Sequence, residues 1–135
     1  MKKSLFMAVA MLVSSSAFAT TDHYVLRDTD HNHVQHLKIT SLNGEVIVSE
    51  DVDFEPNINE AGRPACTADV SGEAKKVSET ELVLRKHLAG EKAVCELKIY
   101  LSPTGARVDQ SDGCQNFAAG ICHFTSDGKE LIKIQ

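Results

Sequence analysis

Three histidines and two aspartates lie within nine residues, at positions 28–36, and form the densest group of potential ligands in the chain. If this stretch is extended, His31 and His33 point to the same side, because side chains on a strand alternate between its two faces. Together with His36 and one further histidine, they could bind Zn²⁺ or Cu²⁺. The same composition is typical of a solvated polar turn that leads into a strand, and we favour this second interpretation.

Signals for catalysis are weak elsewhere in the sequence. No G-x-S-x-G or reactive-cysteine pattern accompanies the histidines, as nucleophilic catalysis would require. Paired acids such as Asp51 and Asp53 lie in polar stretches, not in apolar surroundings that would separate their pKa values. We therefore expect a protein that is not an enzyme and needs no cofactor.

The chain contains four cysteines, which are Cys66, Cys95, Cys114 and Cys122. An even number of cysteines in an exported protein predicts two disulfides, and four cysteines allow three pairings. We favour Cys66–Cys95 with Cys114–Cys122, because the members of the second pair are only a short turn apart. A metal site made of these thiolates is disfavoured, since no C-x-x-C spacing occurs.

The amino terminus predicts export. Lys2 and Lys3 precede an apolar run at residues 5–13, and the motif Ala17-Phe18-Ala19 follows. This pattern is typical of a cleaved signal peptide, and the apolar run is too short for a membrane-spanning helix, which needs about 20 residues. We expect a signal peptide at residues 1–19 and a single β-rich domain at residues 20–135, located in the periplasm or secreted.

The mature part reads mostly as β-strands. Residues 34–42 and 45–49 flank Asn43-Gly44, a dipeptide that favours a two-residue hairpin because both positions of a type I′ turn need positive φ. Residues 50–62 are acidic and are expected to form a long loop with an edge segment near Val52 and Phe54. Further strands are expected at residues 66–70, 95–101, 106–108, 121–124 and 131–134, with turns at 103–105 and 126–128.

Residues 79–89 are ambiguous. Ser78-Glu79-Thr80-Glu81 matches a helix capping box, whereas the neighbouring segments favour a strand with Leu82 and Leu84 facing inward. We favour the strand. The expected fold is therefore an all-β antiparallel barrel or sandwich of about seven or eight strands with two disulfides, and one short helix near 79–89 as the alternative.

Charge narrows the class of partner. The 135 residues carry a formal net charge of −5, and removal of Lys2 and Lys3 leaves 12 basic and 19 acidic residues, a net charge of −7. Such a surface disfavours nucleic acid and steers association with basic proteins. In an extracytoplasmic compartment, basic partners include cell-wall hydrolases. We expect neither membrane insertion nor nucleic-acid binding. The sequence does not decide between a monomer and a homodimer.

Two loops are candidates for contact with such a partner, although the simpler interpretation of both, as plain connections between strands, is the one we favour. One is the acidic segment 51–64, and the other is the segment 102–111. Ser102-Pro103-Thr104-Gly105-Ala106-Arg107 resembles the small-residue-glycine loop of periplasmic lysozyme inhibitors, although Thr104 replaces a serine and Val108 an aromatic residue. The resemblance implies a small β-barrel whose motif loop enters the lysozyme cleft.

The sequence therefore predicts an inhibitor or immunity protein directed against a lysozyme or a peptidoglycan amidase. Glu50 and its acidic neighbours would steer the encounter. The expected partner-binding residues are Asp51, Asp53, Glu55, Thr104, Gly105 and Arg107. The alternatives are a periplasmic metal-binding module that uses His31, His33 and His36, and a structural envelope protein without a dedicated ligand.

Overall fold

Eight antiparallel strands form a closed barrel in which every strand pairs with the next along the chain, and β8 pairs with β1. The structure is a computed structural model that describes residues 19–29, 32–87 and 92–135. It confirms the all-β barrel. The strands are β1 (Thr20–Arg27), β2 (His33–Leu42), β3 (Glu45–Phe54), β4 (Cys66–Ser78), β5 (Glu81–His87), β6 (Val94–Leu101), β7 (Gly105–Gln110) and β8 (Leu131–Lys133).

Two short 3₁₀ helices interrupt the connections, η1 (Ile58–Glu60) and η2 (Asp112–Asn116). Within the described ranges, no helix has the length and apolar composition needed to cross a membrane. Residues 1–18 of the expected signal peptide lie outside the described residues. The signal peptide therefore stays a prediction.

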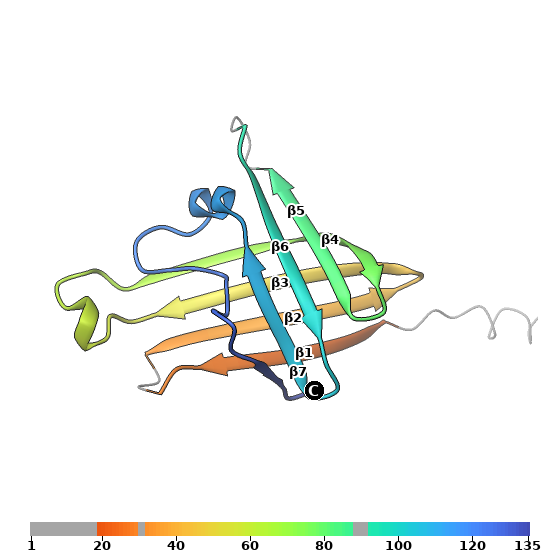
Figure 1. Cartoon of the computed structure of the whole chain (residues 1–135), viewed down its shortest axis with the longest axis horizontal. Helices are drawn as coiled ribbons and strands as arrows, with labels where there is room; N and C mark the ends of the chain where they lie inside the picture. The colour runs from red at the N-terminus through yellow and green to blue at the C-terminus, as the bar shows by residue number, and fades with distance from the viewer. Residues whose placement is uncertain (1–18, 30–31, 88–91) are drawn as a thin grey trace, which may run out of the picture.

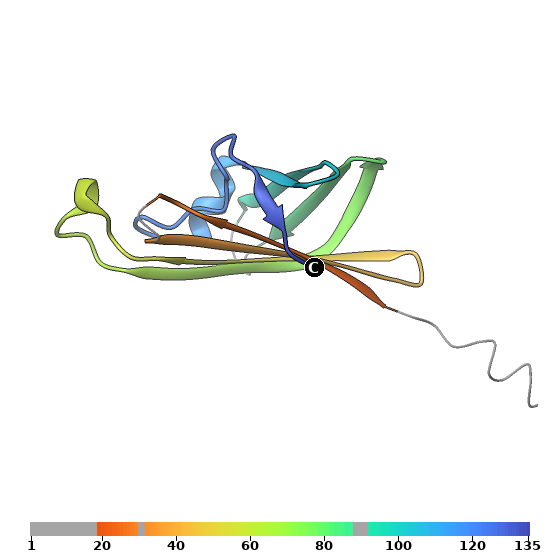
Figure 2. The ribbon, with the colours of Figure 1, turned by 90° about the horizontal axis from the view of Figure 1, so that it is seen from below.

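The barrel is built from two layers that cross steeply. The strands β1 to β3 and the first part of β4 form a long, flat sheet, and β5 to β7 run over it at a steep angle (Figures 1 and 2). β4 belongs to both layers, because its first nine residues pair with β3 and its last part pairs with β5 from Ala74 onward.

Alternation of side chains fills the barrel. On β3, Val48, Val52 and Phe54 are buried, and on β6 Leu97 and Ile99 are fully buried. Residues two apart share a face of a strand, so one face of each strand supplies the core. The expected Asn43-Gly44 hairpin is confirmed: Leu42 pairs with Glu45, and both turn residues have positive φ.

Two expected elements differ in the structure, and one strand was not expected. Residues 50–54 are not loop but the end of β3, because Asp51 and Asp53 face outward while Glu50, Val52 and Phe54 face the core. Residues 121–124 are not a strand; they form an irregular segment with Ile121, Cys122 and Phe124 buried. The strand β1 was not expected at all, and it supplies the buried Tyr24.

The strand interpretation of the ambiguous segment is confirmed. β5 covers Glu81–His87, and Leu82 and Leu84 are buried. The helix alternative is wrong for these residues because β5 pairs with both β4 and β6, which secures its backbone hydrogen bonds in the sheet. Residues 88–91 lie outside the described residues.

Two disulfides are present, but the pairing favoured from spacing is wrong. The bonds are Cys66–Cys122 and Cys95–Cys114. After β7, the chain folds back as η2 over β6, where Ser111 N donates to the Glu96 carbonyl, and this return brings Cys114 beside Cys95. The pairing of the cysteines is therefore set by where the strands end in space and not by the shortest separation along the chain.

Candidate functional site

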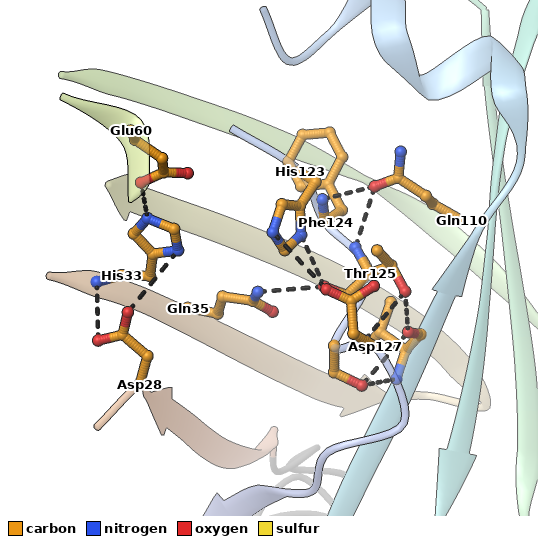
Figure 3. A network of polar contacts seen from close by, with 11 residues as sticks. Asp28, His33, Gln35, Glu60, Gln110, His123, Phe124, Thr125 and Asp127 are labelled. Atoms are coloured by element: carbon orange, nitrogen blue, oxygen red, sulfur yellow. Dashed lines mark hydrogen bonds and ion pairs between the residues drawn. The ribbon is translucent and has the colours of Figure 1, made fainter. Parts of the chain in front are cut away.

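A small polar cavity of about 60 Å³ lies at one end of the barrel, between the β1–β2 end and the segment 122–130. Its walls carry imidazole, carboxylate, amide, hydroxyl and ammonium groups. The lining residues are Leu26, Asp28, His33, Gln35, His123, Ser126, Asp127 and Lys129. Figure 3 shows a network of polar contacts around this cavity, whose members come from β2, η1 and the carboxyl-terminal segment, among others.

His33 is held on all sides. Its Nε2 donates to Glu60 Oε1 at 2.8 Å, its Nδ1 lies 3.8 Å from Asp28 Oδ2, and its ring stacks on Phe54 with centroids 4.2 Å apart. The two carboxylates therefore face opposite ring nitrogens (Figure 3). They do not converge on one point, as the ligands of a single metal ion would have to.

Local backbone chemistry places both carboxylates. Asp28 Oδ1 accepts hydrogen bonds from the N–H groups of Asn32 and His33, which turns the chain into β2. Glu60 closes a capping box with Asn57 at η1. The Asn57 N–H and then His33 hold the pKa of Glu60 below its ordinary value, although burial opposes this shift.

His123 faces the same cavity from the other wall. Its Nδ1 lies 2.9 Å from the Thr125 carbonyl, so this nitrogen carries the proton and donates, and Nε2 lies 3.8 Å from Asp127 Oδ2. Its ring meets Phe54 edge-on, with centroids 4.9 Å apart. Within the described ranges, no hydroxyl or thiol is hydrogen-bonded to an imidazole, so no nucleophile–base pair is assembled there.

The carboxyl-terminal segment is anchored through its backbone. Gln110 Oε1 accepts from the N–H groups of Phe124 and Thr125, and Ser126 N donates to the Val108 carbonyl. Together with the fully buried Phe124, these bonds hold the segment in place at the end of the barrel. We call residues 122–130 the plug segment.

Two buried side chains, Gln35 and Glu50, carry oxygen atoms that have no hydrogen-bond partner in the described part of the chain. Gln35 Nε2 donates to the Thr125 carbonyl, but Gln35 Oε1 has no partner, and neither has the carboxyl group of Glu50. Glu50 is fully buried on the inner face of β3, where burial, and secondarily Asp51, raise its pKa well above the ordinary value. The expectation that Glu50 steers a partner is therefore wrong, because its side chain faces the core.

The expected metal ligands do not gather on one face. His33 faces inward, whereas His36 faces outward and its Nδ1 lies 3.0 Å from His23 Nε2. His31 lies outside the described residues. Residues 33 and 36 fall on opposite faces because they are three positions apart on one strand. In the described part of the chain, no three His, Cys, Asp or Glu side chains are arranged to hold a metal ion.

The expected partner-binding residues occupy two separate surfaces. Asp51 and Asp53 are exposed on the outer face of β3, and Glu55 follows at its end. Thr104, Gly105 and Arg107 belong to the β6–β7 turn and to β7. Three strands separate β3 from β7 in either direction around the barrel, so the two groups lie on opposite walls.

The β6–β7 turn is fixed by Glu130. Thr104 Oγ1 donates to Glu130 Oε1 at 2.6 Å, and Ser102 Oγ donates to the same oxygen at 3.1 Å. Gly105 is buried, and a Cβ there would meet the Leu131 carbonyl. Thr104 and Arg107 are therefore available for contact, while Gly105 serves to pack the turn.

The outer face of β3 and β4 carries a second, larger depression. It has a volume of about 260 Å³ and is lined by His36, Asp51, Val52, Asp53, Thr67, Ala68 and Asp69. Asp51 pairs directly with Asp69 across the two strands, and Asp53 with Thr67. None of these three aspartates is in an ion pair with a described residue. We call Asp51, Asp53 and Asp69 the acidic face.

The comparisons with known proteins give no relative: no family model, no curated protein and no solved structure matches the chain significantly.

Asp69 and Gln35 are two of the residues of these sites that sequence reasoning missed. Asp69 joins the acidic face only because the register of β3 and β4 places it opposite Asp51. No short turn motif in the sequence predicts this register. Gln35 could have been found, because it alternates with Leu37 and Ile39 on the inner face of β2.

Proposed function

We propose that this chain is an exported inhibitor or immunity protein that binds a basic cell-wall hydrolase, either a lysozyme or a peptidoglycan amidase. The acidic face carries the proposal. Three carboxylates that form no ion pair with a described residue line one depression, and two of them lie directly opposite each other. Like charges placed opposite each other on a sheet are unfavourable, and a cationic side chain from a partner would relieve this repulsion.

Rigidity of the surface supports tight binding. The acidic face lies on two strands that pair over nine consecutive positions, and Cys66–Cys122 fixes the beginning of β4. A surface that is ordered before binding loses little conformational entropy when it binds. Charge complementarity also accelerates the encounter and makes its rate sensitive to salt.

The β6–β7 turn is a separate candidate contact. It is held by Glu130 and presents Thr104, with Arg107 exposed on β7. Because this turn lies on the wall opposite the acidic face, a compact partner that binds one surface leaves the other free. The two surfaces can therefore be tested independently.

The decisive experiment measures binding and inhibition with purified lysozymes and peptidoglycan amidases at low and high salt. We expect inhibition that weakens in high salt. The triple variant Asp51→Asn, Asp53→Asn, Asp69→Asn should weaken binding at least tenfold. The matched control Glu45→Gln, Asp109→Asn, Asp112→Asn removes the same charge from exposed positions elsewhere and should bind nearly as the parent does.

A second pair of variants tests the turn. If Thr104→Ala or Arg107→Ala abolishes inhibition while the acidic-face variant does not, the contact surface is the β6–β7 turn. Absence of binding to every lysozyme and amidase at micromolar protein would reject the proposed function. It would leave a structural envelope protein as the remaining interpretation.

Export is part of the proposal and has its own test. The two disulfides are consistent with an oxidising compartment. Mass spectrometry of the native protein should find a chain that begins at Thr20 and has no thiol open to alkylation before reduction. An intact amino terminus or four reactive thiols would contradict it.

A further inference from the structure

The first half of β4 has a strand on only one side. Residues 66–73 pair with β3, but β5 pairs with β4 only from Ala74 onward, because β5 turns away with β6 into the crossing layer (Figure 1). A strand with one neighbour presents unpaired N–H and C=O groups along its free side. We call the free side of residues 66–73 the β4 edge.

No described strand pairs with the β4 edge. No backbone or side-chain hydrogen bond outside the β3 pairing reaches residues 66–73 from the described residues. The plug segment meets β4 through the Cys66–Cys122 bond. Ala68 and Gly72 face inward yet stay partly exposed, whereas Val70 between them is buried. The β4 edge therefore carries no strand and is partly exposed to solvent.

The features that normally protect such an edge are sparse. Natural edges are blocked by proline, bulges or charged side chains that point inward. The register shift in β4 lies further on, between Lys76 and Ser78, and Pro64 precedes the strand. Two β5 side chains reach the far end of this region, where a Gly72 Cβ would lie 3.1 Å from Leu84 Cδ1 and 3.9 Å from Lys86 Nζ.

The acidic side chains beside the β4 edge indicate which kind of strand could bind there. The outward side chains of this half-strand are Thr67, Asp69, Ser71 and Glu73, all of them exposed, and Asp51 and Asp53 lie on the adjacent strand. A second copy of this chain would bring the same acidic side chains together across the new pair, which is unfavourable. An extended segment with lysine or arginine at alternate positions would instead face these carboxylates, since alternate residues of a strand are about 7 Å apart on one face.

We propose that the β4 edge binds an extended basic segment of the partner protein as an additional antiparallel or parallel strand. This inference rests on the proposed function and specifies its binding mode. Backbone hydrogen bonds supply affinity, and the alternate cationic side chains supply selectivity through Asp69 and Glu73. The acidic face then contacts the same partner beside the added strand.

The test uses the intact disulfide-bonded protein and a synthetic octapeptide of alternating lysine and threonine, so it does not depend on any hydrolase. Backbone amide shifts and hydrogen exchange are measured by NMR. We expect binding with at least tenfold slower exchange confined to amides of residues 66–73. The same peptide with its central amides N-methylated, which removes its donors on both sides, should lose at least tenfold in affinity.

Two further arms separate charge from strand addition. A peptide with glutamate in place of lysine should not bind, and the variant Asp69→Lys, Glu73→Lys should lose binding while Asp109→Lys retains it. Equal binding of the N-methylated peptide, or shifts located away from β4, would overturn the strand addition. If the peptide binds the β4 edge but no hydrolase is inhibited, the proposed function fails and this binding mode stands. If a hydrolase is inhibited but hydrogen exchange at residues 66–73 is not slowed, the strand addition fails and the proposed function stands.

Discussion

Cys66 at the start of β4 is bonded to Cys122 in the plug segment, 56 residues further along the chain. The bond joins the flat sheet to the segment that fills the end of the barrel, next to the polar cavity. It is therefore the covalent link between the two parts of the molecule on which the candidate sites depend.

Removal of this bond should destabilise the protein more than removal of the other. The loop closed by Cys66–Cys122 spans 56 positions and that closed by Cys95–Cys114 spans 19. Loop entropy predicts losses of about 4 and about 3 kcal/mol for the paired Cys→Ala variants. Urea unfolding of both variants measures the difference, and peptide mapping without reduction checks the pairing. A larger loss for the shorter loop would contradict the entropic argument.

Glu50 should make the protein less stable as pH rises. Because its folded pKa is raised above the ordinary 4.5, the folded state keeps a proton that the unfolded state releases. The free energy of unfolding therefore falls between the ordinary and the raised pKa, by at most about 1.4 kcal/mol per pH unit from this group.

The variant Glu50→Met removes this titration and fills a similar volume. We expect a higher free energy of unfolding than the parent at pH 8 and a smaller difference at pH 4, measured by urea unfolding across pH. The control Asp109→Asn changes an exposed carboxylate on β7 and should leave the slope unchanged. A parent protein that gains stability from pH 5 to pH 8 through Glu50 would contradict this assignment.

The outer histidine pair should weaken the fold in acid. Burial, then the charges of His36 and Lys38, lower the pKa of His23 below 6.5. Below that pH the unfolded state takes up a proton that folded His23 resists, so stability is lost on acidification until the folded pKa is reached. His36→Gln should raise the NMR titration midpoint of His23 and reduce this loss. The control variant His87→Gln, at an exposed position at the end of β5, should change neither the titration midpoint of His23 nor the loss of stability in acid.

Gly105 should tolerate no side chain. A Cβ there would meet the Leu131 carbonyl and Glu130, which are part of the contact that closes β7 against β8. Gly105→Ala should lower the free energy of unfolding by about 1–3 kcal/mol, as overpacking does. Gly72→Ala is the matched control, since its Cβ would lie 3.1 Å from Leu84 Cδ1, at the end of a side chain that can move. Equal thermal stability of both variants would contradict the steric explanation.

The sequence predicted the barrel class where local chemistry is decisive. Asn43-Gly44 encodes its own turn, and the alternation at Cys95, Leu97 and Ile99 encodes an inner face. It failed at residues 50–54, where acidic composition concealed the same alternation. A period-two count through Val48, Glu50 and Val52 would have predicted both the continued strand and the buried carboxyl.

The sites depended on information that is not local. Asp69 reaches Asp51 only through the register of β3 and β4, and the connection at residues 55–65 is too long to fix that register. The same holds for His123, which meets Phe54 although the two residues lie far apart in the sequence. In contrast, the separation of His33 from His36 followed from strand periodicity alone.

The pairing order of the barrel has a kinetic consequence. Among the described strands, seven pairs join neighbours in sequence, and only β1–β8 joins distant parts of the chain, through a strand of three residues. The pairs joined by short turns form as hairpins in microseconds, whereas a long closure is slow because its entropy is lost before its contacts form. Folding should therefore proceed by successive zipping of hairpins, and the final closure should set the refolding rate.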